Sequence, residues 1–139
     1  VTSRVGFLNN QKAQIAALQR FTQKNLESIN ADYSSTVNGI PVTPGGVGYA
    51  SHFLGAGGFK QWRSCGYQPS CLPAEAIANN KSYNPQTMND MLMGRMAEGA
   101  GGMAHVIRIK SVRSMLSISD SAADWAPLQS AWTAHISLL

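Results

Sequence analysis

Apolar residues near the start of the chain recur at the spacing of one helical face. The separations are three, four, seven and eight residues, which predicts a long amphipathic helix over roughly residues 7–33. The apolar positions are Leu8, Ile15, Leu18, Leu26, Ile29 and Tyr33. We expect this stripe to pack against the rest of the fold. The same helix is also a candidate surface for self-association.

Residues 34–72 carry turn signals rather than a long periodic pattern. Asn38-Gly39 lies between Val37 and Ile40, and Asn-Gly flanked by apolar residues is a strong hairpin signal. The stretch 43–58 is rich in glycine and poor in charge, so it is interpreted as an ordered loop that buries its few large apolar side chains. The cysteine-bounded turn follows this loop.

The segment 73–98 predicts two short helices, each with a proline at its start. Pro73 opens the first, and Asn84 caps the second with Pro85 at its first position. The second helix has a face rich in methionine. Flexible methionine side chains either fill a core or bind partners, and both interpretations stand. Met91 and Met96 are the candidate partner-binding residues on this face.

The last forty residues predict strands and a closing helix. Residues 103–119 alternate between apolar and polar positions in two stretches that can pair as a hairpin. Asp124 is a typical N-cap, and it opens a predicted helix over 124–138. Together the pattern predicts one α+β domain over 1–139. In it the N-terminal and C-terminal helices pack on a small antiparallel sheet, with the two short helices in the middle.

Composition narrows the function classes. Charged residues make up 13% of the chain, about half of the roughly 25% usual in globular proteins. A surface rich in hydroxyl and amide groups is typical of secreted and cell-surface proteins. The net charge of +4 is spread thinly. Its tightest group is Arg108, Lys110 and Arg113, which gives only a weak nucleic-acid-binding hypothesis, so no nucleic acid is expected as partner.

The two cysteines point to a disulfide. Cys65 and Cys71 enclose five turn-forming residues, and closing so short a loop removes about 2–2.5 kcal/mol of unfolded-state entropy. Disulfides persist in oxidising compartments, so an extracellular, periplasmic or cell-surface location is expected. No apolar run is long enough to span a bilayer. Removal of a signal peptide or anchor would explain the start at Val1, as would cutting of this segment from a longer chain. We expect membrane contact only through such a removed anchor.

One arrangement of residues suggests catalysis. Cys71 precedes Pro73 at a predicted helix start, where the helix dipole favours a thiolate, and His105 lies on a predicted strand. This layout resembles that of papain-like and NlpC-type cysteine hydrolases. The resemblance implies Cys71 as nucleophile and His105 as base. The alternative is structural, with Cys71 in the disulfide and His105 half-buried.

Metal and cofactor signals are weak. His52, His105 and His135 are far apart and lack the ligand spacing of zinc sites, and the sequence does not decide whether they meet in space. No glycine-rich segment has the pattern of a phosphate-binding loop. We therefore expect neither a metal nor a cofactor.

The remaining features favour interaction with another protein. Trp62 and Tyr67 lie beside the cysteines and are either exposed aromatic anchors or core residues. A long helix feeding a small disulfide-bearing α+β head is similar in outline to bacterial type IV pilin ectodomains, which implies an assembly role. The methionine-rich helices, the few strands and the mid-chain disulfide depart from that pattern. The expected function is an exported or cell-envelope interaction or assembly domain without catalytic activity.

Overall fold

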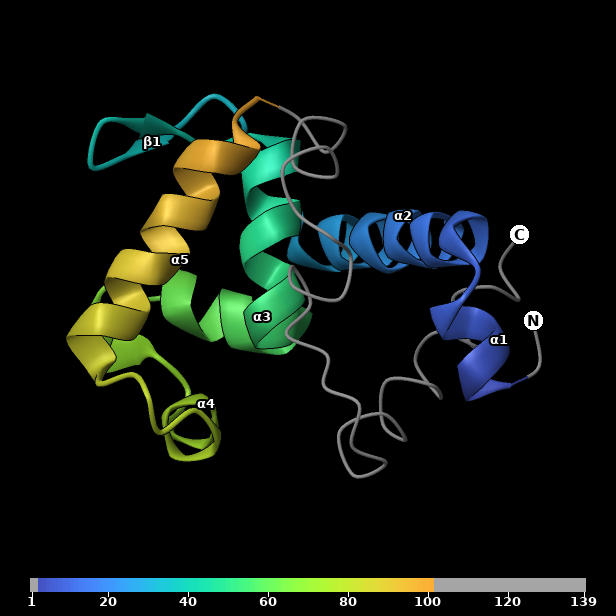
Figure 1. Ribbon diagram of the computed structural model, residues 1–139. Coiled ribbons are helices and arrows are strands. Elements are labelled where there is room, and N and C mark those ends of the chain that lie inside the picture. Colours follow the sequence, from blue (N-terminus) through green and yellow to red (C-terminus); the bar gives the residue numbers. More distant parts are fainter. Residues whose placement is uncertain (1–2, 102–139) are drawn as a thin grey trace.

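The computed structural model describes residues 3–101 and confirms a small α+β fold that is mostly helical (Figure 1). The predicted strands of 103–119 and the predicted helix over 124–138 lie outside the described residues. The elements are α1 (Arg4–Leu8), α2 (Gln11–Ile29), β1 (Thr36–Val37), β2 (Ile40–Pro41), α3 (Pro44–Arg63), the 3-10 helix η1 (Pro69–Cys71), α4 (Ala74–Asn79) and α5 (Pro85–Gly99).

The predicted helix over 7–33 is wrong at both ends. Asn10 interrupts it, because its side chain accepts a hydrogen bond from the Ala13 N–H and so caps α2. Gln14 then ties the two helices together by donating to the carbonyls of Phe7 and Leu8, at 2.9 and 2.8 Å. At the other end Asn30 adopts a left-handed conformation with φ 48°, which ends α2. The spacing of apolar residues alone does not predict these helix caps.

The Asn-Gly hairpin is confirmed. β1 and β2 pair antiparallel, with Thr36 opposite Pro41 and Val37 opposite Ile40. Asn38 and Gly39 have φ values of 51° and 77°, the pair of left-handed residues that a two-residue turn of type I′ requires.

The loop predicted over 43–58 is instead most of α3. Thr43 caps this helix by accepting from the Gly46 N–H at 3.0 Å, and Pro44 occupies its first turn. A bend occurs at Gly55, whose φ is 72°. Glycine has low helix propensity, but propensity is a weak prior that tertiary packing overrides. In this segment, packing against α2 and α5 outweighs the low helix propensity of the glycines.

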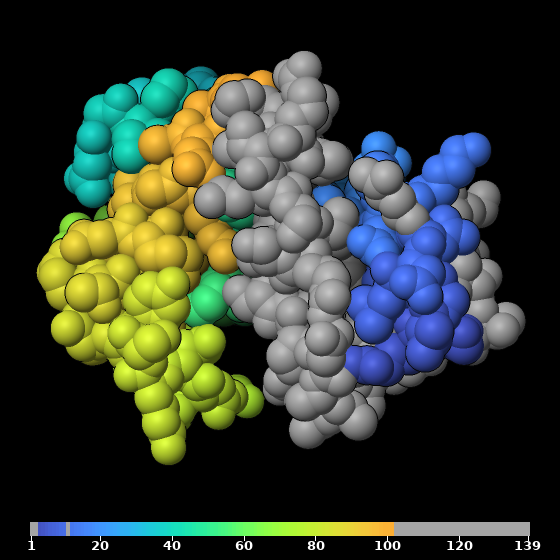
Figure 2. Space-filling model, in the orientation of Figure 1, coloured from blue at the N-terminus to red at the C-terminus, as the bar shows by residue number. Residues whose placement is uncertain are grey.

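The described core lies around α3, which stands between α2 and α5 (Figure 1). The hairpin contacts α5 through β2. In the space-filling view the hairpin, α4 and α5 form one side of the molecule, and α1 and α2 lie on the other (Figure 2). The largest wholly buried side chains are Trp62, Phe59, Leu18, Ile29, Met88, Leu92, Met96, Val42 and Val47.

Backbone meets backbone where the start of α3 crosses the end of α5. A Cβ atom added at Gly46 would lie 2.6 Å from the carbonyl oxygen of Met96. One added at Gly99 would lie 2.6 Å from the Cα of Gly46 and still closer to the Gly45 carbonyl oxygen. Real Cβ atoms do not approach so closely, so this crossing requires glycine on both helices.

Gly99→Ala is expected to lower the free energy of unfolding by about 2–4 kcal/mol, because the new methyl group forces the two helices apart. The matched control is Gly94→Ala on the same helix, where an added Cβ meets nothing within 4 Å. Alanine's higher helix propensity should make that variant neutral or more stable by about 0.5–1 kcal/mol. Urea unfolding followed by far-UV circular dichroism measures both. Equal effects of the two substitutions would contradict the close crossing.

Candidate functional site

The predicted disulfide is confirmed. Cys65 and Cys71 are bonded, with their Cα atoms 6.2 Å apart. They close a turn, called the cysteine turn below (residues 65–71), that begins just after α3 and ends in η1. In this structure Cys71 is a disulfide sulfur and not the thiolate that a cysteine hydrolase needs. Its proposed base, His105, lies outside the described residues.

Trp62 and Tyr67 belong to the core, so of the two interpretations left open by the sequence, exposed anchors or core residues, the second holds. Trp62 is 0% exposed and Tyr67 is 8% exposed. Together with Phe59 they form an aromatic cluster in which each pair of rings meets edge to face, with centroids 4.9–5.8 Å apart. The Trp62 indole N–H donates to the Asn89 side-chain oxygen at 2.7 Å. The cysteine turn thus folds Tyr67 back over the end of α3.

The methionine face of α5 is used mainly for packing. Met88 and Met96 are fully buried, so the core interpretation holds for Met96. Met91 and Met93 are half-buried against the same core. Of the two methionines predicted to bind a partner, only Met91 therefore keeps exposed surface.

A polar layer between α2 and α3 was not predicted from the sequence. It consists of Thr22 and Asn25 on α2 and Ser51 and His52 on α3, all buried. Asn25 donates to the Ser51 hydroxyl at 3.2 Å. On α2, Thr22 and Asn25 lie on the same helical face as the buried residues Leu18 and Ile29. Their position on this face was the one sign in the sequence that these polar residues are buried.

The hydrogen bonds of Thr22 favour one tautomer of His52. The Thr22 hydroxyl donates to the Leu18 carbonyl at 2.7 Å and lies 2.6 Å from His52 Nε2. Because the Thr22 hydroxyl donates to Leu18, it can accept a proton from His52, which favours the tautomer with the imidazole proton on Nε2. Nδ1 then keeps a lone pair, and it is buried without a hydrogen-bond partner among the described residues.

Burial keeps His52 neutral. Loss of hydration lowers its pKa to about 3, and the positive charge of Arg95 on α5 acts in the same direction. Arg95 itself lies over the rings of Tyr49 and Phe53, at 4.9 and 5.4 Å from their centroids. A neutral imidazole is a potential base or metal ligand, but this one is only 7% exposed. Its observed role is to hold α2 against α3.

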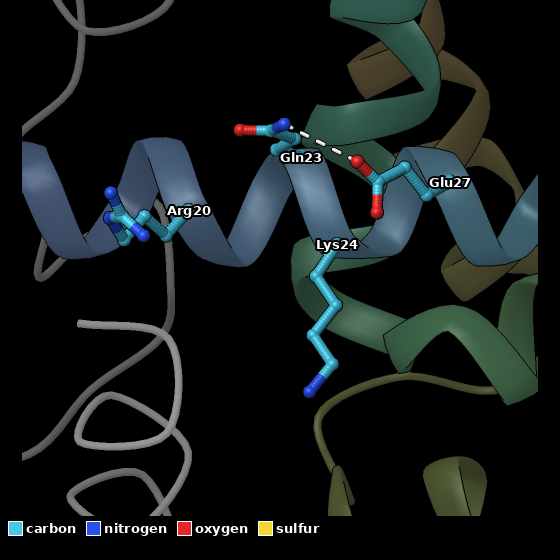
Figure 3. Close-up of a pocket in the computed structure, with 4 residues that line it drawn as sticks. All are labelled: Arg20, Gln23, Lys24 and Glu27. Carbon is cyan, nitrogen blue, oxygen red and sulfur yellow. Dashed lines mark hydrogen bonds between the residues drawn. The ribbon is translucent and has the colours of Figure 1, made fainter. Parts of the chain in front are cut away.

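A small surface hollow of about 250 Å³ lies along α2 (Figure 3). Gln23 donates to Glu27 at 3.3 Å, and Lys24 extends away from both. Arg20 also lines it. The four described lining side chains come from one helix and carry mixed charge, so they alone indicate no particular ligand chemistry.

The other sequence-based candidates receive no structural test. Two sets of candidates lie outside the described residues: His135, and the basic group Arg108, Lys110 and Arg113. The structure therefore does not show whether the three histidines come together or whether the basic residues form a patch. Within residues 3–101, no three His, Cys, Asp or Glu side chains gather as metal ligands would. The helices of this part also lack the length and apolarity of a membrane span.

Asn89→Ala is expected to lower the free energy of unfolding by about 1–3 kcal/mol, because it leaves the buried Trp62 indole N–H without an acceptor. The control is Asp90→Ala, one residue along α5, whose side chain is exposed. That change should cost less than about 0.5 kcal/mol. Chemical denaturation of both variants gives the comparison, and a control as damaging as Asn89→Ala would refute the assigned role.

A low-pH loss of stability should follow from His52. A pKa of about 3 in the folded chain, against an ordinary 6.5, means that the unfolded chain binds the proton more readily. The stabilisation is therefore complete above pH 6.5 and is lost as pH falls toward 3. Between pH 7 and pH 4 the free energy of unfolding of the wild type should fall by about 3 kcal/mol relative to His52→Gln. Parallel pH profiles of the two proteins would exclude a neutral buried His52.

Comparisons with known proteins were made at three levels. Protein-family models, curated proteins and solved structures gave no match to this chain. The function must therefore be inferred from the residues and contacts described above.

Proposed function

We propose that this chain is a protein-interaction or assembly domain of an exported or cell-envelope protein, without catalytic activity. The observation that carries the proposal is the Cys65–Cys71 disulfide. A disulfide is stable in oxidising compartments and is rare in the reducing cytosol. The low charge content supports the same location.

The disulfide also bears on the chemistry of the chain. Its two sulfurs are the only cysteine sulfurs in the sequence, and both are bonded. A cysteine nucleophile would therefore require prior reduction. His52, the one histidine in the described residues, spends its N–H on Thr22 between two helices. These groups are committed to holding the fold, which favours a binding role over a catalytic one.

The outer face of α2 is the surface that we propose for partner contact. The apolar stripe of this helix is already used, because Leu18 and Ile29 are buried within the chain. Self-association through α2 would therefore use its polar outer side. Large apolar side chains are exposed at both ends of this region. They are Val5 on α1, 63% exposed, and Tyr33 just after α2, 44% exposed.

The test combines location with contact. Protein acid-quenched in its native cells should resist alkylation at both cysteines until it is reduced, and it should fractionate outside the cytoplasm. A photo-crosslinking amino acid in place of Tyr33 should give a discrete protein adduct, identified by mass spectrometry. The same amino acid in place of Lys81, which is exposed near α4, should not. Tyr33→Ala should then weaken binding of the identified partner at least tenfold, since exposed tyrosines often dominate interfaces.

Two outcomes would overturn the proposal. One is a reduced, cytoplasmic protein in native cells. The other is hydrolase activity that appears on reduction, survives Cys65→Ser and is lost in Cys71→Ser, because only a Cys71 nucleophile gives that combination.

A further inference from the structure

The cysteine turn holds its backbone in an unfavourable conformation. Gly66 and Tyr67 are consecutive residues with positive φ, at 79° and 62°. Glycine adopts this region freely, but for a bulky residue such as tyrosine it is a genuine outlier. Such residues persist only where the surroundings hold them in place.

Two kinds of contact hold Tyr67. Its ring packs edge to face against Trp62 and Phe59, and its N–H donates to the Trp62 carbonyl at 3.1 Å. The second is covalent, because the disulfide closes the turn around it. The bond joins residues six apart in the sequence, and it limits how far the turn can move when its other contacts open. Removal of the bond leaves the ring contacts, the Tyr67 hydrogen bond and the 3.0 Å hydrogen bond from the Gly66 N–H to the Arg63 carbonyl to hold the strained backbone.

The covalent constraint is open to chemical attack. Cys65 lies on the exposed surface, whereas Cys71 in η1 is half-buried. Thiol–disulfide exchange requires a thiolate to reach one sulfur along the S–S axis, and access decides which sulfur is attacked. Cys65 is the more exposed residue of the pair, so we expect an external thiolate to reach its sulfur first.

We propose that the cysteine turn is a redox-controlled element: an external dithiol reduces the disulfide by attack on Cys65, and Tyr67 then leaves Trp62 while the helices stay folded. The thiolate of the dithiol bonds to Cys65 Sγ, and the S–S electron pair leaves on Cys71 Sγ, which takes up a proton. The second thiolate of the dithiol displaces Cys65 and closes its own disulfide. Two electrons and two protons pass to the chain. The partner of this reaction is a dithiol oxidoreductase or a small dithiol.

The helices stay folded because α3 contacts α2 and α5 directly, in addition to the smaller contacts that η1 makes with α3 and α5. Trp62 keeps its hydrogen bond to Asn89 on α5. The glycine crossing and the polar layer lie on the first half of α3, on the other side of Gly55 from the turn. The change is thus confined to the turn, and it uncovers the ring of Tyr67.

The test is residue-resolved hydrogen exchange by NMR on the full chain, before and after treatment with dithiothreitol without denaturant. The exchange rate of the Tyr67 amide should rise at least tenfold. Its upper value is the roughly 30-fold factor that corresponds to the entropy of closing so short a loop. Exchange of the Trp62 indole N–H should change less than threefold. A single-thiol probe, glutathione, trapped by acid during reduction should be found on Cys65.

The double variant Cys65→Ser/Cys71→Ser is the matched control. It should reproduce the fast Tyr67 exchange without reductant and show no further change with dithiothreitol. If this variant does not fold, the wild type, folded oxidised and then reduced, still decides the question. The proposal is overturned by a disulfide that resists dithiothreitol in the folded chain, by glutathione trapped on Cys71, by an unchanged Tyr67 amide, or by equal acceleration at Trp62. None of these outcomes depends on the compartment or on a protein partner, so this proposal and the proposed function can fail separately.

Discussion

The rest of the described structure depends on the contact between two helix backbones, at the start of α3 and the end of α5. Gly46 and Gly99 allow it because neither has a Cβ. The far ends of the same two helices are joined by the hydrogen bond from Trp62 to Asn89. Since the start of one helix meets the end of the other at each point, α3 and α5 run antiparallel and are fixed at both ends. The methionines of α5 then fill the space between these two points.

The opposite side of α3 is fixed by a different kind of contact. There the polar layer places hydrogen bonds of defined direction in the interface with α2, and directional bonds specify register more narrowly than apolar contact does. His52 takes part in these directional bonds in its neutral form. A charged imidazole at this position would be opposed by burial and by repulsion from Arg95. The two sides of α3 are therefore complementary, with close backbone approach on one and polar specificity on the other. Both serve to position the helices, which is consistent with a scaffold that presents a surface.

The sequence predicted the features whose cause is local. The Asn38-Gly39 turn, the start of α5 at Asn84-Pro85 and the disulfide all depend on residues next to one another in the chain. Features whose cause is tertiary were missed. Glycines in α3 looked like a loop because the helix they contact lies fifty residues further on. The sequence did not decide whether Trp62 and Tyr67 are surface anchors or core residues, because their burial depends on how the turn folds back. The polar layer was missed because Thr22 and His52 are thirty residues apart, and no local sequence pattern predicts their contact.

Gly55 divides one helical segment into two parts with different neighbours. The first part carries Ser51 and His52 to α2, and the second carries Phe59 and Trp62 to the cysteine turn. The non-helical backbone of Gly55, with φ 72° and ψ 170°, places a kink between these two parts. Because the kink separates them, we expect the two parts to open as separate units. A disturbance at the disulfide would then reach the second part of α3 before it reaches the contact between α2 and α3.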